Sequence, residues 1–402
     1  MAKKRSTKES AAPVELERPY SSAMPEAILL LFTAVSIIFF GLTVLYSTSF
    51  AVHGVSFFTK QVIWMLVGSC GAFATVVLGY RWLSDHSWLW MTGCSILLVW
   101  AMLSAPIKGA NRWVSVAGMT IQPSEFTKVA LVLFLAWFLS NRTRDMENAP
   151  FLRVLLPVGL LCGPVILLVL LGKDLGTTAL LVAVFFAVLF VAGLRLRYIL
   201  PFVLVLPTLV FFLIMQYNPE RASRLTSFLD PESCQMADGY QLWNSFLALG
   251  SGNWHGIGFT ESRLKLKYLP EAHTDFILSI VGEELGFIAV GSVIMAYLLF
   301  AFFGVRIGTK ARTRQGMLVA FGMVAFITMQ AIINMGVICG AFPTKGMPAP
   351  MISYGGSTLV SCMLAVGCIF SVALDNSYPK YDELLREKWL GWLDKKKKKK
   401  KA

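Results

Sequence analysis

Charged residues are scarce in this sequence: Asp, Glu, Lys and Arg make up 15% of its 402 residues, against about 25% in soluble proteins. Hydrophobic residues make up 56%, and the 32 glycines add to them, which takes the apolar share well above the roughly 45–50% of soluble domains. This composition excludes an ordinary soluble enzyme. It is typical of a polytopic membrane protein.

The sequence also lacks the cysteine spacings of disulfide frameworks and metal sites. Of its 7 cysteines, six lie in or beside apolar runs, where thiols behave as small hydrophobes, and only Cys234 falls in a polar connection. No Cys-x-x-Cys pair is present, so no zinc or redox motif follows. A cleaved signal peptide is not indicated either, because the first apolar run, residues 27–46, is too long and lacks a small-residue cleavage site.

Long apolar runs account for most of the chain. A helix needs about 20 apolar residues to cross a bilayer, and hydropathy predicts ten such spans, near residues 27–47, 60–79, 87–105, 123–140, 152–171, 176–193, 198–217, 277–303, 316–338 and 354–374. The spans must be helices, because lipid offers no partners to an open backbone. We therefore expect an all-α polytopic membrane protein with a membrane domain (27–375), a polar N-terminal segment (1–26) and a basic tail (376–402).

The positive charges are divided unequally between the two sides of this bundle. With the N-terminus in the cytoplasm, 25 of the 36 Lys and Arg residues fall on the cytoplasmic side, as the positive-inside rule requires. We therefore expect a multi-pass protein of the cytoplasmic (inner) membrane with both termini in the cytoplasm. This topology and the attraction of anionic membrane lipids explain the net charge of +13, so no nucleic acid is expected as a partner.

Two polar regions have an expected local structure. The connection 218–276 on the outer side is the longest, and a connection of this length is usually functional; its stretch 240–249, YQLWNSFLAL, has the apolar content of a short helix at the membrane surface. In the tail, aromatic residues and leucines from Tyr381 to Leu393 recur at roughly helical spacing before a lysine run. That pattern favours either an interfacial helix or a solvated tail without structure.

Ionisable groups at the outer ends of the spans are the candidates for chemistry, because such groups are costly in a membrane. A helix tolerates Pro123 in its first turn, so the fourth span should begin there and place Glu125 and Lys128 on one face. They form either a self-neutralising pair or a charged wall of a cavity. Arg112 and Trp113 precede them and, taken alone, would be an interfacial anchor.

The richest polar segment precedes the eighth span. It runs from Lys265 to Asp275. Asp275 stands where partial loss of water would make its carboxylate a usable general base. Alternatively, Thr274 or Asp275 only caps the helix that follows.

A single carboxylate is expected to act alone. Glu283 and Glu284 lie about 12–13 Å beyond Asp275 along a straight helix, whereas paired carboxylates in glycosidases stand roughly 5–9.5 Å apart. Small residues would line the face of this helix beneath the acid, namely Ser279, Gly282 and Gly286. That stripe is either a helix contact or the floor of a groove.

Two other connections on the outer side also have an expected structure. Asp174 lies in a tight turn and is expected to cap the sixth span. The connection 340–357 holds three prolines and four glycines, with Lys345 as its only charge. It is either a re-entrant, cavity-lining loop or a plain surface turn.

Several long segments carry a resemblance to a known family. They are GANRWVSVAGMTIQPSEFTK (109–128), KDLGTT (173–178), DPES with GYQLWNS (230–245), KYLPEAHTDFILSIVGEELG (267–286) and NMGVICGAFPTKGMPAPMISYGGST (334–358). In order and spacing they resemble the FtsW/RodA/SpoVE (SEDS) family over roughly residues 27–375, and its division members more than its elongation members. The chain departs from the family pattern at 253–255, at Thr260 and at Lys173.

The resemblance implies a peptidoglycan glycosyltransferase that polymerises lipid II into glycan strands at the outer face of the membrane during cell division. It also implies a class B penicillin-binding protein, a transpeptidase, as partner, together with other division proteins. The family's essential acid corresponds to Asp275. The substrate-binding candidates carried over in the same way are Arg112, Trp113, Glu125, Lys128 and Lys265. We add Lys345, His273 and Ser353 as further candidates from the same outer segments.

One carboxylate suits this chemistry, because the donor carries its own diphosphate leaving group and needs no protonating acid. The departing diphosphate needs a cation. The candidates on the outer side are Arg112, Lys128, Lys265, Lys345 or a divalent ion. No cluster with metal-ligand spacing identifies a metal site.

Four alternatives remain open at this point. They are a RodA-like elongation polymerase, a lipid II flippase, a non-catalytic division scaffold and an O-antigen-type polymerase. A flippase needs polar residues through the membrane midplane on several spans, and here they concentrate at the outer ends. Glu283 and Glu284 would be the evidence for it.

Overall fold

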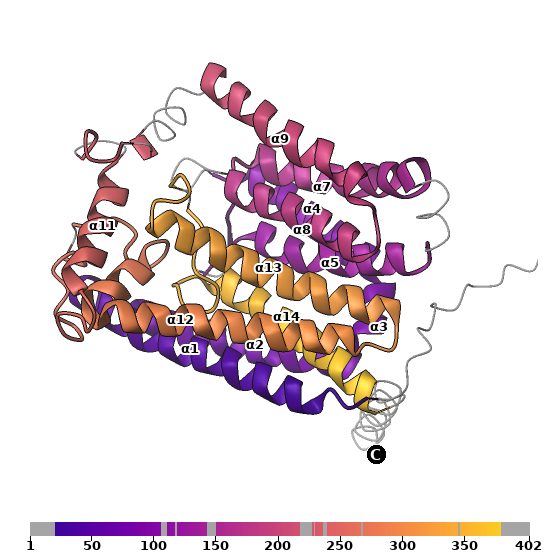
Figure 1. Ribbon diagram of the computed structural model, residues 1–402, viewed down its shortest axis with the longest axis horizontal. Coiled ribbons are helices and arrows are strands. Elements are labelled where there is room, and N and C mark those ends of the chain that lie inside the picture. Colours follow the sequence, from indigo (N-terminus) through magenta and orange to yellow (C-terminus); the bar gives the residue numbers. More distant parts are fainter. Residues whose placement is uncertain are drawn as a thin grey trace, which may run out of the picture.

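The computed structural model describes residues 21–105, 111–116, 119–142, 150–217, 227–228, 230–235, 239–266, 268–344 and 346–378. Helices dominate it (Figure 1). They are α1 (Met24–His53), α2 (Ser56–Leu78), α3 (Tyr80–Asp85), α4 (Ser87–Leu103), α5 (Pro123–Ser140), the π-helix η1 (Pro150–Leu155), α7 (Leu156–Leu171), α8 (Leu175–Val191), α9 (Leu196–Tyr217), α11 (Tyr240–Gly252), α12 (Ile277–Thr309), α13 (Arg314–Ile338) and α14 (Gly356–Ser377). Strands β1 (Val114–Val116) and β2 (Met119–Ile121) form a short antiparallel hairpin.

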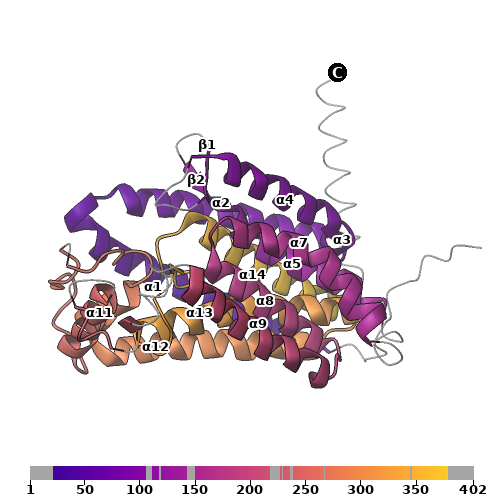
Figure 2. The ribbon, with the colours of Figure 1, turned by 90° about the horizontal axis from the view of Figure 1, so that it is seen from above.

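The long helices run back and forth along one axis, and the two ends of the resulting bundle differ. Helix α11 and the loops around it cover one end, which we call the loop end (Figures 1 and 2). The start of α1 and the finish of α14 lie at the other end, which we call the terminal end. There the backbone N–H of Ala23 donates to Ser377 Oγ at 3.1 Å.

Three helices form the centre of the bundle. Of the most apolar stretch of each helix, 89% is buried in α5, 78% in α14 and 61% in α13, against 28% in α2 and α12. The outer helices expose large apolar side chains such as those of Phe32, Leu103 and Phe287. An apolar surface of this extent requires a lipid environment, so the predicted α-helical, polytopic membrane fold is confirmed.

Each of the ten predicted spans coincides with a helix, with ends shifted by a few residues. Within the described residues, seven helices are long and apolar enough to cross a membrane: α1, α2, α5, α7 with η1, α12, α13 and α14. Three apolar helices are shorter, at Ser87–Leu103, Leu175–Val191 and Leu196–Val205. The count of ten crossings and the domain limits stay predictions, as does the tail helix, which lies outside the described residues.

The long connection folds around α11, which includes the predicted helix 240–249. This helix packs against the first part of α12. Ser245 Oγ and Ser279 Oγ share a hydrogen bond at 2.7 Å, and a Cβ built at Gly252 would lie 1.8 Å from Gly282 O. The small-residue stripe on α12 is therefore a helix contact.

The start of α12 differs from the prediction. Its N-cap residue is Phe276, which makes no side-chain cap bond. Neither Thr274 nor Asp275 occupies the capping position, and Thr274 Oγ1 donates instead to Glu271 Oε2 at 2.8 Å. Because Phe276 occupies the N-cap position and no side chain caps the helix, the alternative prediction that Thr274 or Asp275 caps α12 is wrong.

A break at Gly286 divides α12, so the predicted span 277–303 is not one straight helix, although its first part, up to Glu284, is regular. Gly286 has φ 76° and ψ −175°, a backbone conformation that is essentially restricted to glycine. The loop 253–258 lies against this break. Gly258 N–H donates to Glu284 O at 3.1 Å, and Phe287 N–H donates to Asn253 O at 2.8 Å. Backbone groups that the break releases thus find partners inside the protein, as a membrane environment requires.

The hairpin β1–β2 was not anticipated from the sequence. It pairs Val114 with Ile121 and Val116 with Met119. The signal for it was short, since β-branched residues flank a small turn over only eight positions. The hairpin returns the chain to Pro123, where α5 begins as predicted.

Replacing Gly286 with alanine should destabilise the fold. The glycine-only backbone costs another residue about 1–3 kcal/mol, and the new Cβ would lie 2.4 Å from Gly256 N. We expect the apparent melting temperature of purified Gly286→Ala to fall by several degrees. Gly291→Ala is the matched control, because it lies on the same helix with no atom within 4 Å of its Cβ. Equal melting temperatures for the two variants would contradict this account of the break.

Candidate active site

A buried ion pair lies at the start of α5, the most enclosed helix. Lys128 Nζ donates to Glu125 Oε2 at 2.7 Å and to Gln330 Oε1 on α13 at 2.6 Å. Ser361 Oγ on α14 donates to Glu125 Oε2 at 3.2 Å. The Lys128 and Glu125 side chains are 1% and 3% exposed. The two charges therefore neutralise each other, as the first of the two predictions for them states. Through these hydrogen bonds the pair links the three central helices α5, α13 and α14.

Asp174 collects polar groups from three segments at the loop end. Its Oδ1 accepts from Thr177 N–H at 3.3 Å, so it caps α8 as predicted. Its Oδ2 accepts from Gln122 Nε2 at 2.7 Å and from Ser124 Oγ at 3.0 Å. Arg112 Nη1 lies 3.6 Å from Oδ1. The sequence analysis treated Asp174 as a cap alone and missed this ion pair, because nothing in the spacing of the two residues relates them.

Arg112 also borders a second carboxylate. Its guanidinium carbon lies 5.9 Å from the Trp113 ring centroid. A Cβ built at Gly346 would lie 3.8 Å from Arg112 Nη2 and 3.2 Å from Asp275 Oδ2. Arg112 Nε is buried and has no hydrogen-bond partner within the described part of the chain. A buried donor in that state calls for a partner, which an anionic ligand would supply.

Asp275 lies in the turn directly before α12 and is half-buried. Its backbone carbonyl accepts from Asn334 Nδ2 on α13 at 2.8 Å, which fixes the turn against the central helices. Residues far apart in the sequence thus meet at the loop end, where the Asp275 carboxylate and the Arg112 guanidinium both lie within 4 Å of the Cβ position of Gly346.

The loop 346–355 forms one side of this site. It has no regular helix, and Met347, Ala349, Met351 and Ile352 are buried. This agrees with the prediction of an irregular, buried loop rather than a plain surface turn. Ser353, a predicted site residue, accepts from Ala349 N–H through Oγ at 2.8 Å. Lys345, the other predicted residue of this loop, lies outside the described residues.

His273 packs against the same loop. Its ring centroid lies 4.9 Å from that of Phe57 on α2 and 5.9 Å from that of Tyr354. The backbone N–H of Tyr354 donates to His273 O at 2.9 Å. His273 therefore joins the turn of Asp275 to this loop, whereas the Ser353 hydroxyl makes its bond inside the loop.

Lys265 belongs to a second cluster, which it forms with Ser47, Thr260 and Glu284. Its Nζ donates to Ser47 Oγ at 3.1 Å, to Thr260 O at 2.7 Å and to Glu284 Oε1 at 2.7 Å. Ser47 Oγ also donates to Glu284 at 2.7 Å. An ammonium group has three donors, and these contacts engage all three.

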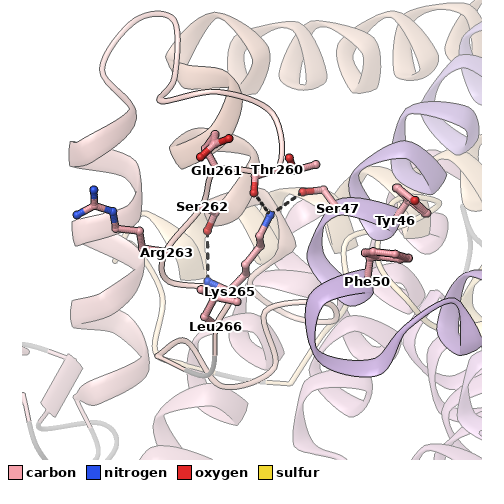
Figure 3. Close-up of a pocket in the computed structure, with 9 residues that line it drawn as sticks. All are labelled: Tyr46, Ser47, Phe50, Thr260, Glu261, Ser262, Arg263, Lys265 and Leu266. Atoms are coloured by element: carbon pink, nitrogen blue, oxygen red, sulfur yellow. Dashed lines mark hydrogen bonds between the residues drawn. The ribbon is translucent and has the colours of Figure 1, made fainter.

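A cavity of about 420 Å³ lies beside this cluster (Figure 3). Its walls come from the end of α1 and from the loop after α11, and are made by Tyr46, Ser47, Phe50, Thr260, Glu261, Ser262, Arg263, Lys265 and Leu266. Figure 3 shows Lys265 reaching across toward Ser47, whereas Arg263 points the other way. The cluster therefore joins α1, α12 and the long connection at the loop end.

No group of three or more His, Cys, Asp or Glu side chains that could hold a metal ion occurs among the described residues. The divalent cation stays a prediction. All seven cysteines are free thiols, so the absence of a disulfide framework agrees with the sequence analysis.

These features define a class of protein: a polytopic membrane protein whose helical bundle presents a carboxylate and a guanidinium from separate connections at one membrane surface. The family model described as cell cycle protein, which covers FtsW, RodA and SpoVE, matches residues 26–378. The chain belongs to this family.

Curated relatives are similar over almost their whole length. The probable peptidoglycan glycosyltransferase FtsW of Trichlorobacter lovleyi is 36% identical over 372 residues, which cover 89% of this chain and 95% of the relative. The protein of the same name from Geobacter metallireducens is 34% identical and covers 86% and 94%.

Solved structures share the fold. A chain of a peptidoglycan synthase complex, described for its coordination of polymerization and crosslinking, is 27% identical with a TM-score of 0.72, over 87% of this chain and 98% of that one. The rod shape determining protein RodA of Thermus thermophilus is 25% identical with a TM-score of 0.63, over 86% and 96%.

Removing one partner of the buried pair should destabilise the bundle strongly. Lys128→Met leaves Glu125 charged and unpaired, which costs about 3–5 kcal/mol. We expect a clear fall in the apparent melting temperature in detergent, and recovery of most of it when Glu125→Gln is added.

Lys310→Met is the matched control, because its pair with Glu26 at 2.7 Å is partly exposed and such pairs contribute about 0–1 kcal/mol. A Lys128→Met protein as stable as this control would show that the central pair does not hold the helices together.

Proposed function

We propose that the chain is a peptidoglycan glycosyltransferase that polymerises lipid II, with Asp275 as the general base. One observation carries the proposal: Asp275 Oδ2 and Arg112 Nη2 border the same point beside Gly346 at the loop end. The names of the curated relatives support the activity. The chain's own residues supply what one glycosyl transfer needs, a base for the acceptor and a cation for the leaving group.

In this mechanism the Asp275 carboxylate removes the proton from the 4-hydroxyl of the acceptor sugar. The hydroxyl oxygen forms a bond to the anomeric carbon of the donor, and the bond from that carbon to the diphosphate breaks. The proton ends on Asp275 and the negative charge on the lipid diphosphate. A positioned base of this kind contributes roughly 10²–10⁴-fold to the rate.

Arg112 is the cation that best fits the leaving group. Its Nε is buried without a partner in the described structure, so a diphosphate oxygen would satisfy a donor that is already removed from water. Lys128 and Lys265 are committed to Glu125 and Glu284 at 2.7 Å each. We therefore assign to them the task of holding the helices around the site, while Trp113 orients the guanidinium.

The loop end faces the outside of the cell in this proposal, with both termini in the cytoplasm. Arg81, Arg142, Arg153, Arg195, Arg306 and Arg314 lie in or beside the turns at the terminal end, which supports this orientation by the positive-inside rule. It suits the substrates, whose lipid tails remain in the bilayer while their sugars project into water.

A class B penicillin-binding protein is the proposed partner, because one similar structure is a chain of a peptidoglycan synthase complex. Other division proteins and anionic membrane lipids are proposed as further partners. The curated relatives are named FtsW, which favours division over the RodA-like elongation role.

A flippase is less well supported. Glu284 is paired with Lys265, and Glu283 accepts from Ser262 Oγ and from Arg263 N–H. Both carboxylates thus have partners from the loop, next to the break in α12. Their role is to bind the loop to α12, and this role requires no transport pathway through the membrane.

Asp275→Asn should abolish polymerisation while folding and partner binding are preserved. The amide has nearly the same shape and cannot accept the proton, so we expect turnover of lipid II by the purified protein with its transpeptidase to fall by at least about 10²-fold. Melting temperature and co-purification with the partner should match those of the wild type.

Asp230→Asn makes the same chemical change at an exposed position of the long connection. An amide oxygen can still accept the 3.2 Å bond from Ser233 N–H, so turnover should stay at the wild-type level. Wild-type turnover by Asp275→Asn would refute the assignment of the base, and failure of the wild-type complex to make glycan would favour a scaffold.

A further inference from the structure

Helix α13 carries two buried side-chain amides one turn apart, and both face the loop 346–355. Gln330 Nε2 donates to Pro348 O at 2.9 Å. Asn334 Nδ2 donates to Met347 O at 2.8 Å and to Asp275 O at 2.8 Å. Gln330 therefore joins the loop to Lys128 on α5, whereas Asn334 joins the loop to the turn of the proposed base.

The two carbonyls that Asn334 binds belong to the two segments that define the proposed site. One carbonyl is that of Asp275 itself, so fixing it restrains the backbone from which the carboxylate projects. The other belongs to Met347, the neighbour of Gly346, whose Cβ position lies 3.2 Å from Asp275 Oδ2. The Asn334 amide thus restrains the two backbone segments closest to the carboxylate, in addition to the bond from Tyr354 N–H to His273 O.

The oxygen of the same amide is unsatisfied. Asn334 is 1% exposed, and its Oδ1 has no hydrogen-bond partner within the described residues. A buried polar atom in this state destabilises the fold. An apolar residue on α13 would avoid that cost but could not donate to either carbonyl.

We propose that Asn334 is a positioning residue of the transferase site, which holds the Asp275 turn and the Gly346 segment in register so that the carboxylate meets the acceptor hydroxyl opposite Arg112. This inference rests on the proposed function. Asn334 acts through the backbone of Asp275 and contacts no reacting atom.

Loss of a positioning contact is expected to reduce turnover more than binding. A misplacement of about 1 Å at a reacting group can cost roughly 10²-fold in rate. In lipid II polymerisation by the purified complex, Asn334→Ala should lower kcat by about 10–100-fold and leave KM within about threefold. Asn334→Ser, which keeps one donor, should recover part of the lost kcat.

Asn376 offers a matched control. It is equally buried, on α14 at the terminal end. It also joins two segments, since it accepts from Arg312 N–H at 3.1 Å and donates to Ile307 O at 3.4 Å. Asn376→Ala should lower the melting temperature about as much as Asn334→Ala does, with kcat unchanged in the folded fraction.

Gly346→Ala keeps the test decisive even if Asn334→Ala does not fold. The added methyl would meet only the ends of two side chains, Asp275 Oδ2 at 3.2 Å and Arg112 Nη2 at 3.8 Å. The protein should therefore fold with wild-type stability while the carboxylate is displaced by a few tenths of an ångström. We expect kcat to fall by about threefold to tenfold.

The outcomes separate this inference from the proposed function. If the wild-type complex polymerises lipid II and Asn334→Ala retains its kcat, the positioning role is refuted and the function stands. If Asn334→Ala does not fold, a wild-type kcat for Gly346→Ala refutes it instead. Equal losses of kcat for Asn334→Ala and Asn376→Ala would also refute it, because they would indicate a general effect of stability. If the wild-type complex makes no glycan, the proposed function itself fails.

Discussion

Lipid offers no hydrogen bonds, and this constraint explains most of the polar contacts inside the bundle. Lys128 and Glu125 are tolerated on the most enclosed helix because Gln330 and Ser361 complete their hydrogen bonds. The interruption of α12 is tolerated because the loop 253–258 supplies partners to its freed backbone groups. Pairing inside the protein, rather than exposure to water, decides where polar residues are placed in these helices.

The same constraint shapes the candidate active site. The loop 346–355 has no regular structure, so its carbonyl groups need donors from the surrounding helices. Tyr297 OH donates to Pro350 O, and the amides of Gln330 and Asn334 serve Pro348 and Met347. A loop held at so many points is rigid, and a rigid loop can keep one carboxylate in place beside a guanidinium. The hydrogen bonds that satisfy the carbonyl groups of this loop therefore also position the residues of the candidate active site.

Much of the fold could be predicted from hydropathy, because a bilayer-spanning helix needs one long apolar run and each run is visible locally. The start of α5 at Pro123 and the cap at Asp174 were predicted correctly for the same reason, since both depend on residues within one turn. The break at Gly286 was missed, because a glycine in an apolar run looks like a helix contact until the loop that packs on it is placed. The hairpin β1–β2 was missed because its strands are only three residues long.

The sequence by itself determined the class of the protein, the helices and the identity of the candidate acid, because composition, apolar run length and family motifs are properties of the chain alone. Only the tertiary structure decided which charges are committed to each other and which border the site. Lys128 and Lys265 are paired with buried glutamates, whereas Arg112, beside Asp174, keeps one donor, Nε, without a partner among the described residues. These contacts join segments far apart in the chain, and no local pattern encodes the distance between them.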